Sequence, residues 1–490
     1  MQTGVVLFAT LAALLAGCTL GPDYQRPAVP VPAQHRDAEP PAPGREAASL
    51  ADVQWFALFQ DERLQALVRT ALENNYDVRI AAARVLEAAA QLGVTRSFLL
   101  PTIDGTAAVG RERISQENFI PFAPGVSPAG NFFSLGLALT WEVDVWGRIR
   151  RQTEAARAEL FAADWAQRAV LVTVISQVAS AYFTLRELDN ELEIAQRTLA
   201  SRQRSLNLTQ LRLEKGVATR LDVTQAQTLL YTAAATIPLV ERQMVQTENA
   251  IRLLLAQPPG DILRGRTLTE QPIPPEIPAG LPAALLERRP DIRASEEFLI
   301  SANAQIGAAK ALYFPQFSIT GLLGIESAEL SDFVKSKALT WHIGADALQP
   351  IFNYGRIRSI NAATQALYLQ FLVQYEQTIQ TAFREVSDTL IGYYKTREQR
   401  GQQELLVGAL LDSVSLANKR FFGGIDNYLQ VLDAERELFD AELTLARLQR
   451  DELLNIVGLY RALGGGWESV TASSVTPARS AALVTSAAGQ

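Results

Sequence analysis

The stretch Gly147-Arg148-Ile149-Arg150 returns unchanged as Gly355-Arg356-Ile357-Arg358, 208 positions further along the chain. Upstream of it the shift is 214 positions, because Asp77, Arg79, Ala88, Ala90, Gln91, Gly93 and Pro101 recur as Asp291, Arg293, Ala302, Ala304, Gln305, Gly307 and Pro315. The shift of 208 also holds downstream, where Arg212, Gly216, Leu221, Val223 and Ala226 match Arg420, Gly424, Leu429, Val431 and Ala434. A period of about 210 residues is too long for a solenoid of small repeats. We therefore expect two intertwined, duplicated halves, each with helices and strands of its own.

Length and charge restrict the function. The chain has 490 residues and a formal net charge of -7, with a pI near 5.3. Nucleic-acid binding depends on clustered Lys and Arg side chains that release counterions from phosphates. The acidic composition therefore argues against a nucleic-acid partner.

The N-terminus has the features of an export signal. Residues 1–17 carry no charged side chain and are too short to cross a bilayer as a helix. They end in Leu15-Ala16-Gly17-Cys18, which resembles the lipobox that is cleaved before the lipidated cysteine of bacterial lipoproteins. Cys18 is the only cysteine, so it has no disulfide partner within the chain. The resemblance implies that Cys18 anchors the mature chain and that Thr19 directs it to the outer membrane; the alternative is an ordinary buried cysteine.

Proline-rich segments divide the rest of the chain. Residues 18–50 are predicted to form an extended, lipid-anchored tether, and residues 258–282 a linker between the halves. The two structural repeats are then expected at 51–257 and 283–467. The Ala, Ser and Thr residues of 468–490 show no periodicity, which predicts a disordered tail.

Each half contains a heptad pattern of coiled-coil length. In the first half it comprises Leu171, Val178, Leu185, Leu192, Leu199, Leu206 and Leu213. In the second half Arg400 interrupts the series Ile379, Val386, Tyr393, Val407, Val414 and Phe421. Such seams predict supercoiled helices, and about 68 residues would reach about 100 Å. Gly216 and Gly424 end these helices at equivalent places, so we expect helical hairpins over 147–256 and 355–463.

Short segments before the long helices alternate apolar and small or polar residues, which predicts strands. Two β-hairpins are expected, over 100–142 and 314–350, with exposed tips at 120–130 and 326–338. The apolar positions of the four strands are Ile103, Gly105, Ala107 and Val109, then Phe133, Leu135, Leu137, Leu139 and Trp141, then Phe317, Ile319, Gly321 and Leu323, and finally Trp341, Ile343, Ala345 and Ala347.

Four strands cannot close a barrel in lipid, and an unpaired sheet edge there costs several kcal/mol for each backbone group. Several chains would therefore have to share one barrel. Side chains fill an eight-stranded barrel, whereas wider barrels hold water, so a trimer with twelve strands could conduct. A water-soluble sheet packed on helices is the alternative that the strand pattern leaves open.

Three motifs in order resemble the outer-membrane efflux ducts of the TolC and OprM type, in particular their NodT-type lipoprotein subgroup. They are Gly21-Pro22-Asp23-Tyr24-Gln25-Arg26-Pro27, the set Trp55, Phe59, Asp61, Leu64 and Leu67, and Ala462-Leu463-Gly464-Gly465-Gly466-Trp467. The resemblance implies a mainly helical fold with a β-barrel part, in which a homotrimer places a 12-stranded outer-membrane barrel on a 12-helix periplasmic α-barrel. It implies as partners a periplasmic adaptor, an inner-membrane pump, in this subgroup usually of the RND type, and outer-membrane lipid, without a cofactor.

The resemblance also places functional residues. The turns at Gly216 and Gly424 would form the periplasmic tip that faces the adaptor. Asp433 and Arg436 match the carboxylate and arginine of the OprM-like gate, and Asp222 matches an acidic position in the first hairpin. Three copies of Asp433 around the axis would form a ring that binds cations. The alternative for Asp433 and Arg436 is a solvated pair within one helix, worth about 0.2 to 0.5 kcal/mol.

TolC's own locking bonds do not transfer to this chain. Gln430 stands where TolC has a second gate aspartate, and Phe421 and Asp426 stand at the positions of its gate tyrosine and arginine. Trp141 and Trp341 are the expected aromatic girdle of the barrel.

Side chains suited to catalysis or metal binding are scarce. The chain has two histidines, His35 in the tether and His342 in a strand, and no Walker-type phosphate loop. We therefore expect no catalytic site, no metal site and no cofactor. The competing functions are a periplasmic adaptor and a scaffold lipoprotein without a pore. An adaptor would carry one helical hairpin, and a scaffold would leave the strands unexplained.

Overall fold

The computed structural model describes residues 19–36, 49–115, 117, 127–271, 280 and 282–467. The predicted signal peptide, the lipidation site Cys18 and the C-terminal tail lie outside the described residues. Parts of the tether, of the first hairpin tip and of the linker also lie outside them.

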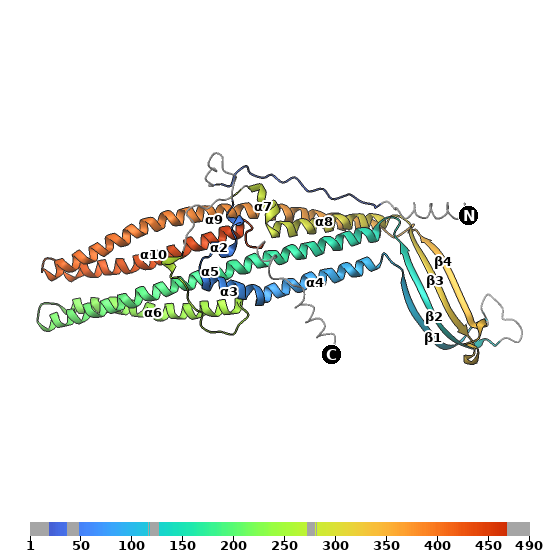
Figure 1. The fold of residues 1–490 in the computed structure, drawn as a ribbon, viewed down its shortest axis with the longest axis horizontal. Coiled ribbons are helices and arrows are strands. Elements are labelled where there is room, and N and C mark those ends of the chain that lie inside the picture. Colours follow the sequence, from blue (N-terminus) through green and yellow to red (C-terminus); the bar gives the residue numbers. More distant parts are fainter. Residues whose placement is uncertain are drawn as a thin grey trace. The chain divides into compact units, whose positions relative to one another are not determined.

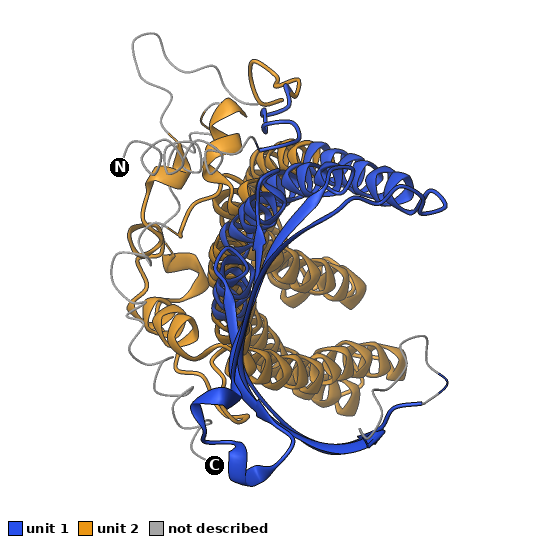
Figure 2. Cartoon of the chain, turned by 90° about the vertical axis from the view of Figure 1, so that its right-hand side faces the viewer, with its two compact units in different colours: residues 1–28, 84–163, 294–376 blue, residues 29–83, 164–293, 377–490 orange. Residues whose placement is uncertain are grey.

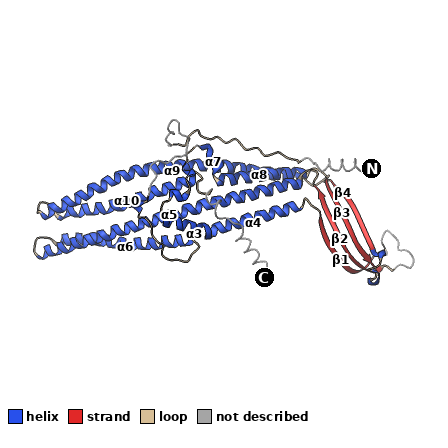
Figure 3. Cartoon of the chain, viewed as in Figure 1, coloured by secondary structure: helices blue, strands red, loops and turns tan. Residues whose placement is uncertain are grey.

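The secondary structure repeats with the sequence (Figures 1 and 3). The first repeat contains η1 (Leu50–Asp52), α2 (Trp55–Leu58), α3 (Glu62–Asn74), α4 (Tyr76–Ser97), β1 (Thr102–Arg113), β2 (Ala129–Val143), α5 (Arg148–Glu214) and α6 (Arg220–Leu254). After η2 (Leu268–Glu270), the second repeat contains α7 (Pro282–Arg288), α8 (Pro290–Ala311), β3 (Gln316–Ser327), η3 (Leu330–Asp332), η4 (Ser336–Ala338), β4 (Leu339–Leu348), α9 (Arg356–Phe422) and α10 (Tyr428–Ala462). Both α5 and α9 have 67 residues, and both α6 and α10 have 35. The expected fold class, with duplicated strand-hairpin and long-helix halves, is confirmed.

The chain divides into two compact units, and each takes segments from both repeats (Figure 2). One unit comprises 1–28, 84–163 and 294–376, and the other comprises 29–83, 164–293 and 377–490. The duplicated halves are therefore interleaved and do not fold as two separate domains.

The first unit contains one antiparallel sheet with the strand order β1-β2-β3-β4. The apolar residues of each strand share one face because they alternate. Several of them are exposed, including Leu137 and Ile343. The first hairpin differs from expectation at its tip, because β1 already ends at Arg113. In the second hairpin, η3 and η4 occupy the expected loop.

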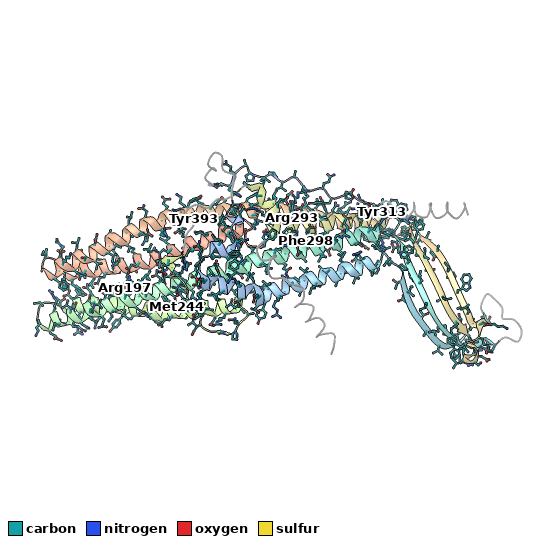
Figure 4. The ribbon with its side chains drawn as sticks, in the orientation of Figure 1. Arg197, Met244, Arg293, Phe298, Tyr313 and Tyr393 are labelled. Atoms are coloured by element: carbon teal, nitrogen blue, oxygen red, sulfur yellow. The ribbon has the colours of Figure 1, made fainter. Side chains whose placement is uncertain are left out.

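The second unit buries a large part of both heptad seams. Leu171, Val178 and Leu185 of α5 are buried, and so are Val386 and Tyr393 of α9, the latter labelled in Figure 4.

The interruption of the second seam has a physical reason. The Nη1 atom of Arg400 lies 3.1 Å from Oε2 of Glu452, a carboxylate of α10 that is fully buried. A buried carboxylate requires a cationic partner, so a charged residue replaces the apolar one in α9.

A buried carboxylate also ties the first repeat to the segment before η2. Asp61 caps α3 by accepting from the backbone N–H groups of Arg63 and Leu64. Its Oδ2 atom accepts from the Tyr182 hydroxyl at 2.9 Å, from Arg266 N at 2.9 Å and from Gln271 Nε2 at 3.0 Å. Burial opposes the charge, but these hydrogen bonds outweigh it and lower the pKa of Asp61.

Candidate functional site

The two hairpin turns have the same geometry. Gly216 and Gly424 have φ angles of +74° and +70°, which glycine adopts without strain. In the first turn, Val217 N donates to Arg212 O at 2.9 Å, and Ile425 N donates to Arg420 O at 2.9 Å in the second. These bonds close each helix as Schellman-type C-caps. Both turns therefore present a short, well-defined loop.

The helices that follow the turns begin differently. Asp222 forms a capping box at the start of α6: its carboxylate accepts from Thr219 N at 2.7 Å, and its own N–H donates to the Thr219 hydroxyl at 3.2 Å. The equivalent position in α10 is Gln430, and Asn427 at its N-cap makes no side-chain capping bond. Asp222 thus stabilises its own helix, whereas the second hairpin lacks this feature.

An ion pair crosses the second turn. Arg420 at the end of α9 binds Asp426 through two hydrogen bonds, of 2.5 Å and 3.0 Å. The Arg420 guanidinium lowers the pKa of Asp426. This ion pair connects the end of α9 to the loop and so holds the second turn in place.

The proposed gate pair lies on the surface of the single chain. Arg436 Nη2 is 3.3 Å from Asp433 Oδ1, with 58% and 45% of the two side chains exposed. The arrangement is an i,i+3 pair within α10. Both charges are therefore available to a neighbouring molecule.

Apolar side chains from all four long helices pack beneath the turns. The buried cluster contains Leu206, Val223, Ala226, Leu230, Ala417, Phe421, Tyr428, Val431, Leu432 and Ala434. The Arg212 guanidinium lies over the Phe421 ring, 4.4 Å from its centroid. Phe421, at the position of TolC's gate tyrosine, thus belongs to this core.

A second polar site was not anticipated from the sequence. Glu187 and Glu191 of α5 are both buried, and they face two arginines of α10. Arg447 Nε lies 2.7 Å from Glu191, and Arg450 Nη1 lies 3.3 Å from Glu187. Residues of α5, α6 and α10 line here an open groove of about 540 Å³. In the sequence, these residues could not be distinguished from the charged face of a solvated helix.

The titration of this second site departs from normal values. Burial, reinforced by the neighbouring Glu191, raises the pKa of Glu187 to about 7, although Arg450 opposes the shift. Close by, Arg197 of α5 (Figure 4) donates to Glu442 of α10 at 2.7 Å. The α5–α10 contact is thus a row of ion pairs, in which the pKa of Glu187 is raised.

The two tryptophans predicted to form a girdle are not at equivalent positions of the sheet register. Trp141 stands opposite Ile319 of β3, whereas Trp341 stands opposite Leu323 of the same strand. Four residues along a strand correspond to about 13 Å. Trp141 Nε1 donates to Leu99 O at 3.1 Å, and 69% of Trp341 is exposed. The two tryptophans therefore occupy different positions along the strand direction, and their role in an aromatic girdle stays a prediction.

Both histidines lie within the described residues. His35 is buried, which lowers its pKa, and His342 lies opposite Leu322 on β4. Within the part of the chain that the structure describes, no three His, Cys, Asp or Glu side chains are grouped to hold a metal ion.

Comparison with known proteins identifies this architecture. The family model described as outer membrane efflux protein matches residues 67–257 and 281–465. The chain belongs to this family. Channels of the family form trimers and work with a periplasmic adaptor and an inner-membrane pump.

Curated relatives and solved structures match this chain over nearly its whole length. The toluene efflux pump outer membrane protein TtgI of Pseudomonas putida is 38% identical over 469 residues, which cover 94% of this chain and 97% of the relative. The cation efflux system protein CusC of Escherichia coli is 34% identical over 459 residues, covering 94% and 98%. The open state of the MtrE outer membrane channel of Neisseria gonorrhoeae gives a TM-score of 0.82 at 30% identity, covering 92% and 99%.

These findings settle the class of function. The protein is the outer-membrane channel component of a tripartite efflux system. The alternatives of a periplasmic adaptor and of a scaffold without a pore do not fit, because the matched proteins are channels.

Proposed function

We propose that this channel is a passive, lipid-anchored duct whose periplasmic end opens and closes at the α5–α6 and α9–α10 turns. The pump, which we propose to be of the RND type, supplies the energy, and the duct carries out no catalysis. The turns at Gly216 and Gly424 are the surfaces that meet the adaptor. Their equal backbone geometry supports a site that recurs six times in a trimer.

The observation that carries the gate proposal is the exposed Asp433–Arg436 pair on α10, a few residues beyond the second turn. In a trimer, three copies of Asp433 would face one another around the axis. Like charges at close range raise one another's pKa and attract cations. Arg436 tempers this repulsion within each copy. Asp222 of the first hairpin supports the gate by holding the start of α6 through its capping box.

Single-channel conductance in planar bilayers tests the gate. We expect Asp433→Ala to raise the conductance and to weaken block by divalent cations, because the ring loses its three carboxylates. Asp388→Ala is the matched control, since Asp388 also forms an exposed intrahelical pair, with Arg384 at 3.9 Å. The control should change neither property. Unchanged conductance and block in Asp433→Ala would remove Asp433 from the gate.

The segment after Cys18 supports the proposed lipid anchor. Leu20 N donates to Trp146 O at 3.2 Å, Asp23 binds Arg151 at 2.8 Å, and Arg26 binds Glu296 at 2.6 Å. These contacts hold the start of the mature chain against α5 and α8. An acyl chain on Cys18 would enter the membrane near the end of the sheet where β2 leads into α5. It would add an anchor that does not span the bilayer.

A further inference from the structure

Strand β1 ends in a charged motif whose side chains point to opposite faces of the sheet. The motif is Arg111-Glu112-Arg113, and the pairing of β1 with β2 continues without a bulge to Arg113. Because successive side chains of a strand alternate, the two arginines lie on the face that carries Val109, and Glu112 lies on the other face. Both arginines are exposed. The apolar face of β1 therefore ends in two adjacent cations.

Charges are sorted between the two faces of the whole sheet. The apolar face is the one that meets lipid in an outer-membrane barrel, since the interior of such a barrel is polar. Within β1 to β4, that face carries Arg111 and Arg113 and no carboxylate. The opposite face carries five carboxylates and no Lys or Arg, namely Asp104, Glu112, Glu142, Glu326 and Asp346. No acid of the strands thus shares a face with the two arginines.

The two arginines lie at the depth where the apolar band of the membrane ends. A strand rises about 3.4 Å per residue, and barrel strands tilt by about 40°. Arg111 and Arg113 follow Thr102, the first residue of β1, by about 23 Å and about 29 Å along the membrane normal. The apolar band of an outer-membrane barrel is about 25 Å tall. An arginine that faces lipid is costly at the bilayer midplane and tolerated at this boundary.

The neighbouring strands turn polar at the same end of the sheet. Asn131 of β2 pairs with Arg111, and its Oδ1 atom accepts a hydrogen bond of 3.0 Å from Arg111 Nη1. β3 ends at Ser327, and the exposed Lys337 lies in η4, directly before β4. The bond to Asn131 holds one guanidinium at the sheet surface and leaves its other N–H groups as donors.

We propose that Arg111 and Arg113 bind the phosphate group of a lipid in the outer leaflet of the membrane. This inference rests on the proposed trimeric duct and adds a lipid site at the rim of its barrel. Guanidinium groups bind phosphate through paired N–H···O bonds. The Cα atoms of alternate residues are about 7 Å apart, so both side chains reach one phosphate.

Apolar surface next to the arginines favours a lipid over free phosphate. Val109 and Ile103 lie on the same face of β1 and are 73% and 62% exposed in the single chain. The acyl chains of a lipid bound at the arginines would cover these side chains, which a free phosphate ion cannot do. The site therefore combines a charged clamp with an apolar surface.

Lipid binding by the detergent-extracted trimer tests the site. The probe is lipid A, a glycolipid that carries phosphate groups, and it is compared with lipid A from which the phosphates have been removed. In a titration followed by native mass spectrometry, the wild type should bind the phosphorylated form roughly tenfold more tightly. Arg111→Gln/Arg113→Gln should abolish this preference. Inorganic phosphate at the same concentration should not displace the lipid.

Two controls separate the site from its surroundings. Glu112→Gln changes the residue between the arginines on the opposite face and should keep the preference. Arg204→Gln/Arg384→Gln removes the same charge from exposed positions of α5 and α9 and should keep it as well. If the double variant at the site does not assemble, the two single Arg→Gln variants replace it, and each should weaken the preference.

Three results would overturn the lipid site. They are equal binding of both lipid forms by the wild type, an unchanged preference after loss of the arginines, and displacement of lipid A by inorganic phosphate. Absence of the wild-type trimer in the same mass spectra would instead refute the proposed duct.

Discussion

Glu187 is a buried acid whose pKa lies near neutrality, so it makes stability depend on pH. Its pKa is raised from 4.5 to about 7 in the folded chain. The fold thus favours the protonated form of Glu187. The contribution of this group to the free energy of unfolding is complete below pH 4.5 and is lost as the pH rises through 7.

We expect Glu187→Gln to remove most of this loss. Between pH 5 and pH 8, the free energy of unfolding should fall by up to about 3 kcal/mol more in the wild type than in the variant. Thermal dissociation of the detergent-solubilised trimer measures this difference. Glu193→Gln, at an exposed position of the same helix, is the control and should behave like the wild type. Equal pH dependence in Glu187→Gln and wild type would contradict the assignment.

The Tyr182 hydroxyl connects two parts of the second unit. It donates to Asp61 and accepts from Gly265 N, both at 2.9 Å. Tyr182→Phe should lower the free energy of unfolding by about 1 to 3 kcal/mol, because the partly buried Gly265 N–H loses its acceptor and Asp61 loses a donor. Tyr231→Phe, at a side chain that is 63% exposed on α6, should have almost no effect. Similar melting temperatures for the two variants would show that the hydroxyl contributes no stability.

The hairpin turns depend on the left-handed backbone conformation of single glycines. Gly424→Ala should destabilise the chain by about 1 kcal/mol, because a Cβ atom is strained at positive φ. Gly408→Ala tests the opposite case within α9, where nothing lies within 4 Å of the added atom and where alanine favours the helix by about 0.5 to 1 kcal/mol. The two variants should shift the melting temperature in opposite directions. A shift in the same direction would mean that the turn does not require glycine.

Helices and strands could be predicted from the sequence because their patterns are local. The heptads gave α5 and α9, and alternation gave all four strands. The interruption at Arg400 could not be explained, since its partner Glu452 lies on another helix. Alternation also identifies which residues of a strand share a face, but not the register in which the strand pairs with its neighbours. Trp341 was therefore matched with Trp141, whereas the observed register makes Gln349 the equivalent of Trp141.

The whole chain was harder to predict than its elements. The duplication predicted two intertwined halves, and the compact units do interleave them, because the strands and the adjoining helix ends of both repeats cluster together. The gate pair was located through family resemblance. In the single chain it is an exposed ion pair within one helix, so its proposed role depends on the sister copies.

The central claim is that the strand edges of each chain are satisfied only by identical copies around one channel. Native mass measurement of the detergent-extracted protein tests this most directly, because it counts chains without assuming a structure. We predict a mass of three chains that persists until heating dissociates the complex. A single chain that stays folded and soluble without detergent after removal of Cys18 would contradict the claim.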